Sequence, residues 1–151
     1  MNTNKQYATF FLNNLFLGVE VLKVQEVIRY QQMTFVPLAP AMIEGLINLR
    51  GQIVTAIDLR RRFDFPSLEE GRRPMNVVIR CDDAAVSLLV DEIGDVIEVD
   101  EDDCERPPET VKGIARELVT GVYKLKDRLL LILDTERATN LPSHVSKIQL
   151  N

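Results

Sequence analysis

Arg50 is the residue whose type and position first suggest chemistry. With Gly51 it joins two runs rich in Leu, Ile and Val in "EGLINLRGQIVTAIDLRRRF", residues 44–63. These runs predict two strands, and a turn that only reversed the chain would do well with Asn-Gly and polar neighbours. A guanidinium at this corner can form an ion pair with Glu26, which lies in the apolar block "KVQEVI". A pre-oriented arginine is also a frequent hot spot of protein interfaces.

The chain offers little that could catalyse a reaction. Its one histidine, His144, lies in a weakly patterned C-terminal stretch, and no serine stands in a Gly-x-Ser-x-Gly motif. Neither glycine-rich phosphate-binding motif is present. The acidic run 100–103 lacks the spacing of a calcium loop, and Cys81 and Cys104 lack the spacing of a zinc site. We therefore expect a protein that is not an enzyme and has no metal and no cofactor.

Charge and hydropathy narrow the class of partner. The net charge of −5 argues against nucleic acid as the main partner. Residues 1–74 carry nine Lys and Arg against seven Asp and Glu, whereas residues 75–151 carry nine against sixteen. The N-terminus lacks the regions of a signal peptide, and the longest apolar run, 129–133, is far shorter than the ~20 residues of a spanning helix. We expect a cytoplasmic protein that does not insert into a membrane.

Two blocks of the first half recur in the second half in the same order, with apolar residues in register. Residues 44–63 recur at 120–139, a shift of 76, and residues 19–28 recur at 88–97, a shift of 69. The matched positions include Gly45 with Gly121, Arg50 with Lys126 and Glu26 with Asp95. We interpret this pattern as the duplication of one small unit.

Each half is dominated by short strand patterns that end at Gly, Pro or turn residues. "QYATFFLN" and "LFLGVEV" flank Asn13-Asn14, and "MNVVIRC" and "AAVSLLV" flank Asp82-Asp83, which predicts one tight hairpin in each half. Short strands in two equal copies favour two small closed β-barrels with few, short helices. We expect lobe one over about 15–74, lobe two over about 75–140 with the N-terminal strand 6–13, a boundary at the polar stretch 66–74, and a flexible tail over 141–151.

Together these blocks resemble the CheW family of chemotaxis coupling proteins. The most specific part is Gly-x-x-Asn-Leu-Arg-Gly followed by an apolar strand and Asp-Leu, residues 45–59. "VLKVQEVI" stands upstream, and "LLVDEIGDVIEV" and "LVTGVYKLKDRLLLILD" stand downstream in the family's order, so the resemblance covers about residues 6–140. It implies a single CheW-like domain over residues 1–151. The implied fold is all-β, with two SH3-like five-stranded barrels related by pseudo-twofold symmetry.

The resemblance also implies a function and its residues. Such adaptors have no activity of their own and link the helical tips of chemoreceptors (methyl-accepting chemotaxis proteins) to the regulatory domain of the histidine kinase CheA, at membrane receptor arrays. The receptor-facing groove carries over to Val24, Glu26, Val27, Gly45, Arg50, Val77 and Val78. The kinase-facing surfaces carry over to two Pro-containing loops, at Phe35, Val36 and Pro37 and at Glu105, Arg106, Pro107 and Thr110. The seam between the lobes is the expected place for a receptor helix to dock.

Two places depart from the family's pattern. Ser87 stands where the family often has Gly, which predicts a narrower or more polar groove. Arg106 directly precedes Pro107, and Thr110 replaces a large apolar side chain that some members have. This second departure puts the kinase contact on lobe two in doubt or indicates a divergent kinase.

Two other functions stay open from the sequence alone. One is a small-ligand binding β-barrel whose seam holds a metabolite, which would show a thermal shift with the ligand alone. The other is a coupling domain of another chemosensory-like pathway, belonging to a larger chain.

Overall fold

A computed structural model describes residues 3–82 and 84–140. The expected flexible tail, 141–151, lies outside the described residues, as does His144. The strands are β1 (Asn4–Leu12), β2 (Leu15–Glu20), β3 (Val24–Ile28), β4 (Ile43–Leu49), β5 (Gln52–Asp58), β6 (Met75–Cys81), β7 (Ala84–Val90), β8 (Glu92–Asp100), β9 (Val119–Lys124) and β10 (Leu129–Leu133). The helices are α1 (Leu59–Arg62), α2 (Ile114–Glu117) and α3 (Thr135–Thr139), with 3-10 turns η1 (Val21–Lys23) and η2 (Glu101–Asp103).

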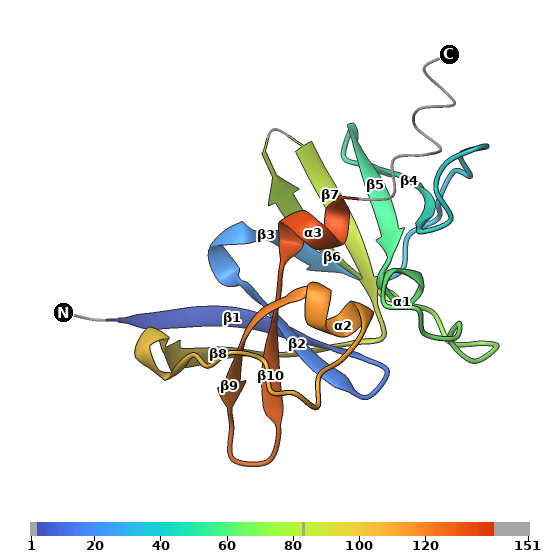
Figure 1. The fold of residues 1–151 in the computed structure, drawn as a ribbon. Coiled ribbons are helices and arrows are strands. Elements are labelled where there is room, and N and C mark those ends of the chain that lie inside the picture. Colours follow the sequence, from blue (N-terminus) through green and yellow to red (C-terminus); the bar gives the residue numbers. More distant parts are fainter. Residues whose placement is uncertain (1–2, 83, 141–151) are drawn as a thin grey trace.

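The strands form two five-stranded sheets of matching order, shown one above the other in Figure 1. The order β3-β6-β7-β5-β4 makes lobe one, and the order β8-β1-β2-β10-β9 makes lobe two. Each sheet contains one parallel pair, β5 with β7 in lobe one and β10 with β2 in lobe two. The prediction of an all-β fold with two five-stranded lobes and short helices is confirmed. Over the described ranges, no ladder joins the two end strands of either sheet.

Both predicted hairpins are present. Leu12 pairs with Leu15 across Asn13-Asn14, and Cys81 pairs with Ala84 at the end of the β6–β7 hairpin. Asn13 has φ 56° and Asp82 has φ 54°. Asn and Asp tolerate this left-handed conformation better than most residues, because their short polar side chains can bond locally.

The strand order shows that β1–β5 and β6–β10 are two copies of one unit that have exchanged strands. A shift of 69 lays β1, β2 and β3 over β6, β7 and β8, and a shift of 76 lays β4 and β5 over β9 and β10. The registers of the two parallel pairs correspond as well. Thr55 pairs with Val86 in lobe one, and Leu131 pairs with Leu17 in lobe two. The shift of 76 relates Thr55 to Leu131, and the shift of 69 relates Leu17 to Val86. Each sheet takes three strands from one copy and two from the other, so neither copy completes a sheet alone.

Because strands are exchanged, the predicted lobe boundary at 66–74 is wrong. The chain passes from one lobe to the other after β2 and again between β7 and β8. β2 lies in lobe two, and the β6–β7 hairpin lies in lobe one. Lobe one is therefore residues 21–91, and lobe two is residues 3–20 with 92–140. The stretch 66–74 looks like a linker because it is polar and contains Pro and Gly, but it is a loop within lobe one. The N-terminal strand does cross to the second half, where β1 pairs with β8.

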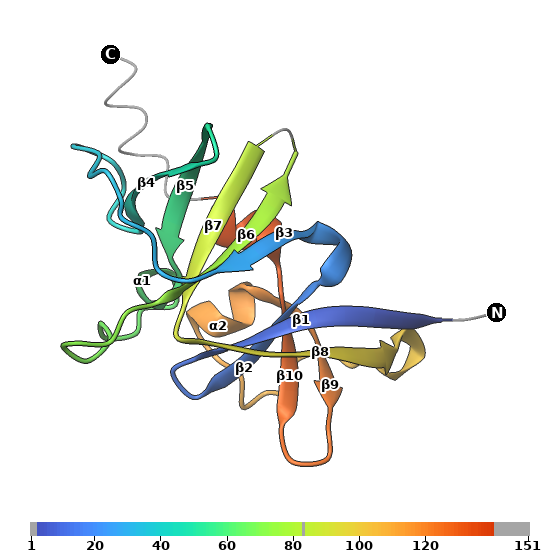
Figure 2. The same ribbon diagram turned by 180° about the vertical axis from the view of Figure 1, so that it is seen from behind.

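Apolar side chains of the chain itself fill the space between the lobes. The largest core cluster draws on both sheets and includes Phe10, Leu17, Phe63, Val77 and Leu131. The helices α1, α2 and α3 lie between the sheets in Figures 1 and 2, and two smaller clusters each lie within one lobe. The seam expected to receive a receptor helix is thus largely occupied by this shared core. No helix in the described part of the chain is long and apolar enough to cross a membrane.

Candidate functional site

Arg50 and Gly51 form the two-residue turn between β4 and β5, where Leu49 pairs with Gln52. Arg50 has φ 52° and Gly51 has φ 88°, the two left-handed conformations of a turn that favours Asn-Gly. Asn48 supports the turn, because its side-chain oxygen accepts a hydrogen bond of 3.0 Å from the Gly51 N–H. An arginine is therefore held in a conformation that L residues rarely adopt. The turn itself gives no reason for this long cationic side chain.

The guanidinium of Arg50 forms an ion pair with the carboxylate of Glu26 on β3, as hypothesised from the sequence. Because β3 and β4 are the two end strands of lobe one, the pair bridges the open edges of the sheet. The Arg50 side chain is 69% exposed and that of Glu26 is 20% exposed. An ion pair this open contributes only about 0–1 kcal/mol to stability. We call these two residues the Glu26–Arg50 corner.

Of the four valines predicted to face a receptor, one is exposed, one is half-buried against the shared core and two are buried. Val27 is 40% exposed, and Val24 is half-buried beside it on β3. Val77 and Val78 lie on β6, where they pair with Val27 and Glu26 of β3. They are only 1% and 0% exposed. They point to opposite faces of the sheet, Val77 into the core shared by the lobes and Val78 into the core of lobe one.

Gly45 shapes the first of the two predicted kinase segments. A Cβ at this glycine would lie 2.7 Å from the carbonyl oxygen of Thr34 and 2.9 Å from the Cβ of Met33. This close approach lets Thr34 and Leu46 exchange two backbone hydrogen bonds of 2.8 Å each. The bonds fix the backbone just before Phe35, whose side chain is 75% exposed. Gly45 is buried and acts on this loop, although it was predicted within the receptor-facing set.

Lobe two repeats the arrangement at the second predicted kinase segment. A Cβ at Gly121 would lie 3.4 Å from the carbonyl oxygen of Glu105. Glu105 and Val122 exchange two backbone hydrogen bonds of 2.8 Å each. The segments 33–38 and 104–110 therefore occupy equivalent places, one on each lobe.

The two segments differ in the side chains they expose. In the first, Phe35 and Pro37 are exposed and Val36 is half-buried; in the second, Glu105, Arg106 and Thr110 are exposed and Pro107 is half-buried. The first segment is thus apolar and the second mostly polar, in line with the departure noted at 106–110.

Three of the most exposed apolar residues were not predicted from the sequence. They are Leu22 at 94%, Leu38 at 77% and Ile53 at 60%. Ile53 could have been found, because the alternation of β5 places it on the face opposite the buried Val54. The other two lie in η1 and in the 29–42 connection, where no strand alternation reports which side chains face out.

Gly45→Ala is expected to loosen the 33–38 segment while the lobes keep their fold. The added methyl group meets a backbone oxygen at 2.7 Å, so the segment must shift and its bonds to β4 must weaken. Amide exchange at Thr34 and Leu46 should accelerate about tenfold, the equivalent of ~1.4 kcal/mol. Gly18→Ala is the control, because the nearest atom to its Cβ is a flexible side-chain carbon of Leu130 at 3.1 Å. Unchanged exchange at Thr34 would contradict this role of Gly45.

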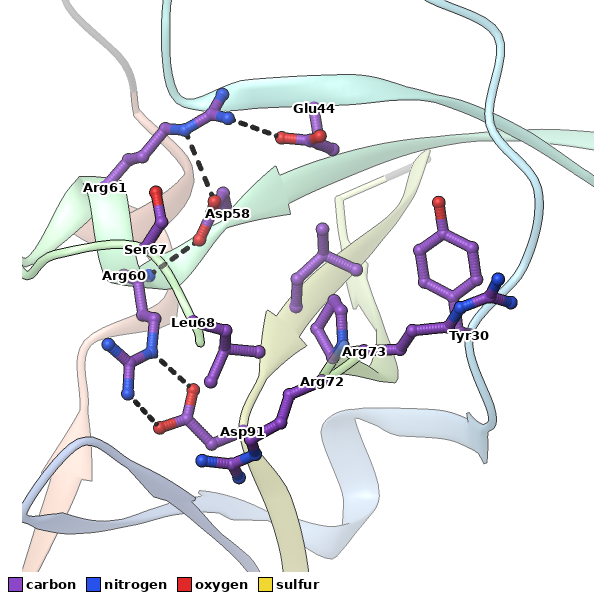
Figure 3. A pocket seen from close by; sticks show the side chains of 12 residues that line it. Tyr30, Glu44, Asp58, Arg60, Arg61, Ser67, Leu68, Arg72, Arg73 and Asp91 are labelled. Carbon is purple, nitrogen blue, oxygen red and sulfur yellow. Dashed lines mark hydrogen bonds and ion pairs between the residues drawn. The ribbon is translucent and has the colours of Figure 1, made fainter. Parts of the chain in front are cut away.

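A charged pocket of about 310 Å³ lies beside the junction of the lobes (Figure 3). Arg60, at the start of α1, donates hydrogen bonds of 2.7 Å from Nε and from Nη2 to the two carboxylate oxygens of Asp91. The backbone N–H of Asn13, in the β1–β2 turn, donates to the same carboxylate at 2.7 Å. Asp91 itself lies between β7 and β8, where the chain crosses from lobe one to lobe two. We call these three residues the interlobe clamp.

The remaining charges of the pocket are largely paired as well. Arg61 bonds Glu44 at 3.0 Å and Asp58 at 3.3 Å, as the dashed lines in Figure 3 show. Arg72 lies 3.4 Å from Glu92, while the guanidinium of Arg73 stacks 5.1 Å from the ring centre of Tyr30. Three of the four arginines that line the pocket thus have carboxylate partners within the chain, and its volume is near the lower end for small-molecule sites. The pocket gives little support to the ligand-binding alternative.

Ser87 is accommodated inside lobe one and does not line a surface groove. It is fully buried and donates a hydrogen bond of 2.7 Å to the side-chain oxygen of Asn76. The Asn76 amide nitrogen donates in turn to the carbonyl of Arg29 at 3.0 Å. The serine therefore adds a satisfied polar network to the core, where a buried hydroxyl needs a partner.

The comparison with known proteins identifies the family. The model of the CheW-like domain matches residues 6–142. The chain belongs to the CheW family. It is 32% identical over 136 residues to the chemotaxis protein CheW of Treponema pallidum, covering 87% of this chain and 80% of that protein. It is 31% identical over 148 residues to CheW of Bacillus subtilis, covering 98% of this chain and 95% of that protein.

A solved structure agrees. The scaffolding protein TtCheW from Thermoanaerobacter tengcongensis matches with a TM-score of 0.82 at 30% identity, covering 91% of this chain and 93% of that one. The resemblance read from the sequence is thereby confirmed. As a CheW-family protein, the chain is a non-catalytic adaptor of chemotaxis signal transduction.

Proposed function

We propose that this adaptor couples the cytoplasmic helical tips of chemoreceptors to the regulatory domain of the histidine kinase CheA. The carrying observation is that three exposed surfaces lie at separate places on one body: the Glu26–Arg50 corner and the two equivalent connecting segments 33–38 and 104–110. An adaptor must hold different partners at the same time, which requires surfaces that do not overlap. We place it in the cytoplasm, recruited to membrane receptor arrays by these contacts.

The receptor surface is proposed at the Glu26–Arg50 corner. Val24 and Val27, on the other face of β3 from Glu26, supply its apolar part. Val77 backs Val27 from the core shared by the lobes, and Val78 lies opposite Glu26 in the core of lobe one. An amphipathic helix can lay its apolar side chains on β3 while one of its carboxylates approaches the exposed guanidinium of Arg50. Gly45 contributes indirectly, because the absence of a side chain at this position lets the segment 33–38 pack against β4.

The kinase surfaces are proposed at Phe35, Val36 and Pro37 on lobe one and at Glu105, Arg106, Pro107 and Thr110 on lobe two. Because these segments are equivalent places on two lobes, one chain can contact two kinase domains head to tail. Such heterologous contacts close into a ring when the rotation permits. Individually weak contacts then gain strength through multivalency.

The charges of the lobes favour this head-to-tail order. Residues 21–91 carry nine basic and nine acidic residues, whereas residues 1–20 and 92–140 together carry eight basic and fourteen acidic residues. The asymmetry predicted from the sequence halves therefore persists, with a neutral lobe one and an acidic lobe two. Contacts between two acidic lobes are penalised, because apposed like charges repel.

Replacing Asp102 and Asp103 with lysine is expected to weaken binding to the CheA regulatory domain several-fold at low salt and to flatten its salt dependence. Both side chains are exposed on η2 beside segment 104–110. Asp100 and Glu101 stay unchanged, because Asp100 accepts a 2.6 Å hydrogen bond from Thr3 and Glu101 lies 3.4 Å from Lys5.

Calorimetric titration between about 20 and 200 mM salt measures both effects, since this range spans the Debye lengths over which surface charges act. The matched control is lysine at Glu69 and Glu70, an exposed acidic pair on lobe one. If affinity and salt slope are the same in wild type and the η2 variant, the electrostatic role is wrong.

Reconstitution tests the proposed function as a whole. A chemoreceptor tip fragment, CheA and this chain, all encoded by one genome, are combined, and autophosphorylation of CheA is measured. We expect the chain to bind each partner separately and receptor-dependent control of the kinase to require it. Absence of binding to both partners would contradict the proposal.

A further inference from the structure

Lobe two carries an aromatic surface that neither proposed kinase segment includes. Phe11 on β1 and Phe16 on β2 are cross-strand partners with ring centres 5.0 Å apart. The guanidinium of Arg128, from the β9–β10 turn, lies 4.8 Å from the ring centre of Phe16 and 5.5 Å from that of Phe11. We call these three residues the aromatic corner.

Two hollows flank the aromatic corner. One, of about 530 Å³, extends past Leu15 and Leu129 to Val111. The other, of about 440 Å³, is lined further by Ile93 and Leu125. Phe11, Phe16, Asp127 and Arg128 border both hollows. Each hollow combines apolar walls with charged edges. A cation stacked on two rings beside such hollows is the combination that interface hot spots favour.

The fold does not require this composition, because the duplication supplies an internal comparison. Under the shifts of 69 and 76, the positions of Phe11, Phe16 and Arg128 correspond to Arg80, Ala85 and Gln52 in lobe one. There the equivalent surface is polar, with Gln25, Gln52, Arg80 and Asp82 around a hollow. Phe16 also belongs to the small core of lobe two, whereas Phe11 is only half-buried.

The charge of Arg128 remains available to a partner. Among the ion pairs of residues 3–82 and 84–140, none involves Arg128 or the neighbouring Lys126. These two cations stand on the lobe with the excess of acidic residues. Stacking fixes the guanidinium without neutralising it, so its N–H groups can bond a carboxylate.

The larger hollow connects the aromatic corner with the second kinase segment. Val111 lines it and directly follows Thr110, the last residue predicted to bind the kinase. Arg116 fixes this stretch, because its Nη1 donates to the carbonyls of Pro108 and Val111 at 2.9 Å and 3.1 Å. The exposed side chains of 104–110 are mostly polar, and this hollow joins them to the apolar side chains of the aromatic corner.

We propose that the aromatic corner is the anchor of the kinase-facing surface on lobe two. An apolar side chain of the CheA regulatory domain enters the hollow between Phe11 and Val111, and a carboxylate beside it pairs with Arg128. This inference rests on the proposed function, because it names the site that completes one of its contacts.

Two variants test the anchor, with the regulatory domain of the cognate CheA as the probe. Arg128→Glu is expected to lower affinity for that domain at least tenfold, because it reverses the charge presented to the carboxylate. Phe11→Ser is expected to act in the same direction, because it removes one wall of the hollow. Binding to a chemoreceptor tip fragment should stay at the wild-type value for both variants, which also shows that they are folded.

The duplication provides the controls. Gln52→Glu and Arg80→Ser change the equivalent positions of lobe one, and they should leave the affinity for the CheA regulatory domain unchanged. Wild-type kinase affinity in both Arg128→Glu and Phe11→Ser would overturn the anchor while leaving the proposed function intact. Loss of receptor binding alone would assign the surface to the receptor and also overturn it. If the wild-type chain does not bind the regulatory domain, the proposed function fails and the anchor fails with it.

Discussion

Asp91→Ala is expected to lower the free energy of unfolding by roughly 3–5 kcal/mol, the usual cost of removing one partner of a buried ion pair. The side chains of Asp91 and Arg60 are only 7% and 11% exposed, so the guanidinium left behind has little access to water. The variant also leaves the Asn13 N–H without its 2.7 Å acceptor. Urea denaturation followed by circular dichroism measures the loss.

A double variant without either charge separates the effect of the charges from that of the volume their side chains fill. Arg60→Met with Asp91→Leu removes both charges, and it should recover much of the stability that Asp91→Ala loses, because no unpaired charge stays buried. Arg61→Met is the matched control, since its side chain is 43% exposed and surface pairs contribute about 0–1 kcal/mol. A loss below ~1 kcal/mol in Asp91→Ala would show that the clamp does not hold the lobes.

The pH dependence provides an independent test of the same carboxylate. Burial would raise the pKa of Asp91, but the hydrogen bonds from Arg60 and from the Asn13 backbone outweigh it and hold the pKa below its ordinary value. A group whose folded pKa is depressed stabilises the fold above its unfolded pKa of about 3.9, and this contribution is lost as the pH falls through the folded pKa. The stability difference between wild type and Asp91→Ala should therefore shrink in acid below about pH 4 and stay constant near neutrality.

The repeat made the architecture predictable, but it could not assign strands to lobes. Local signals such as Asn13-Asn14 and Asp82-Asp83 predict hairpins, because the turn chemistry lies within a few residues. The parallel pairing of β5 with β7 and of β10 with β2 joins strands about 30 and more than 100 residues apart, and such pairing leaves no local signature. The exchange of strands between copies, and with it the true lobe boundary, therefore appears only in the structure.

The candidate site shows the same limit at the level of single residues. The ion pair of Arg50 with Glu26 was predictable, because a cation at a turn and a carboxylate in an apolar block both need a partner. The burial of Val77 and Val78 was readable in principle from the unbroken apolar run in "MNVVIRC", which is typical of a strand covered on both faces. Val77 faces the core shared by the lobes and Val78 the core of lobe one, so both side chains are buried, and their part in receptor binding stays a prediction.

Arg50→Asn is expected to fold at least as well as wild type but to bind a chemoreceptor tip fragment about thirtyfold more weakly, a loss of ~2 kcal/mol. Asn-Gly is the preferred pair for a turn with two left-handed residues, so the substitution suits a backbone with φ 52° at this position. The lost ion pair with Glu26 is too exposed to cost much stability. Thermal unfolding and calorimetric titration with the tip fragment measure the two effects separately.

Retained stability together with weakened receptor binding would show that Arg50 contacts the receptor and does not serve only to stabilise the fold. If Arg50 served only to join the edges of lobe one, Arg50→Asn would lose little in either measurement, and Glu26→Ala would match it. If the guanidinium binds the receptor, Glu26→Ala should cause a smaller loss than Arg50→Asn, because the cation remains but is no longer oriented. Lys126→Asn changes the equivalent turn of lobe two and should leave receptor affinity unchanged.

Normal receptor-dependent activation of CheA by both Arg50→Asn and Glu26→Ala would remove the Glu26–Arg50 corner from the receptor surface. A hot spot at the centre of an interface cannot be deleted without a measurable loss of affinity.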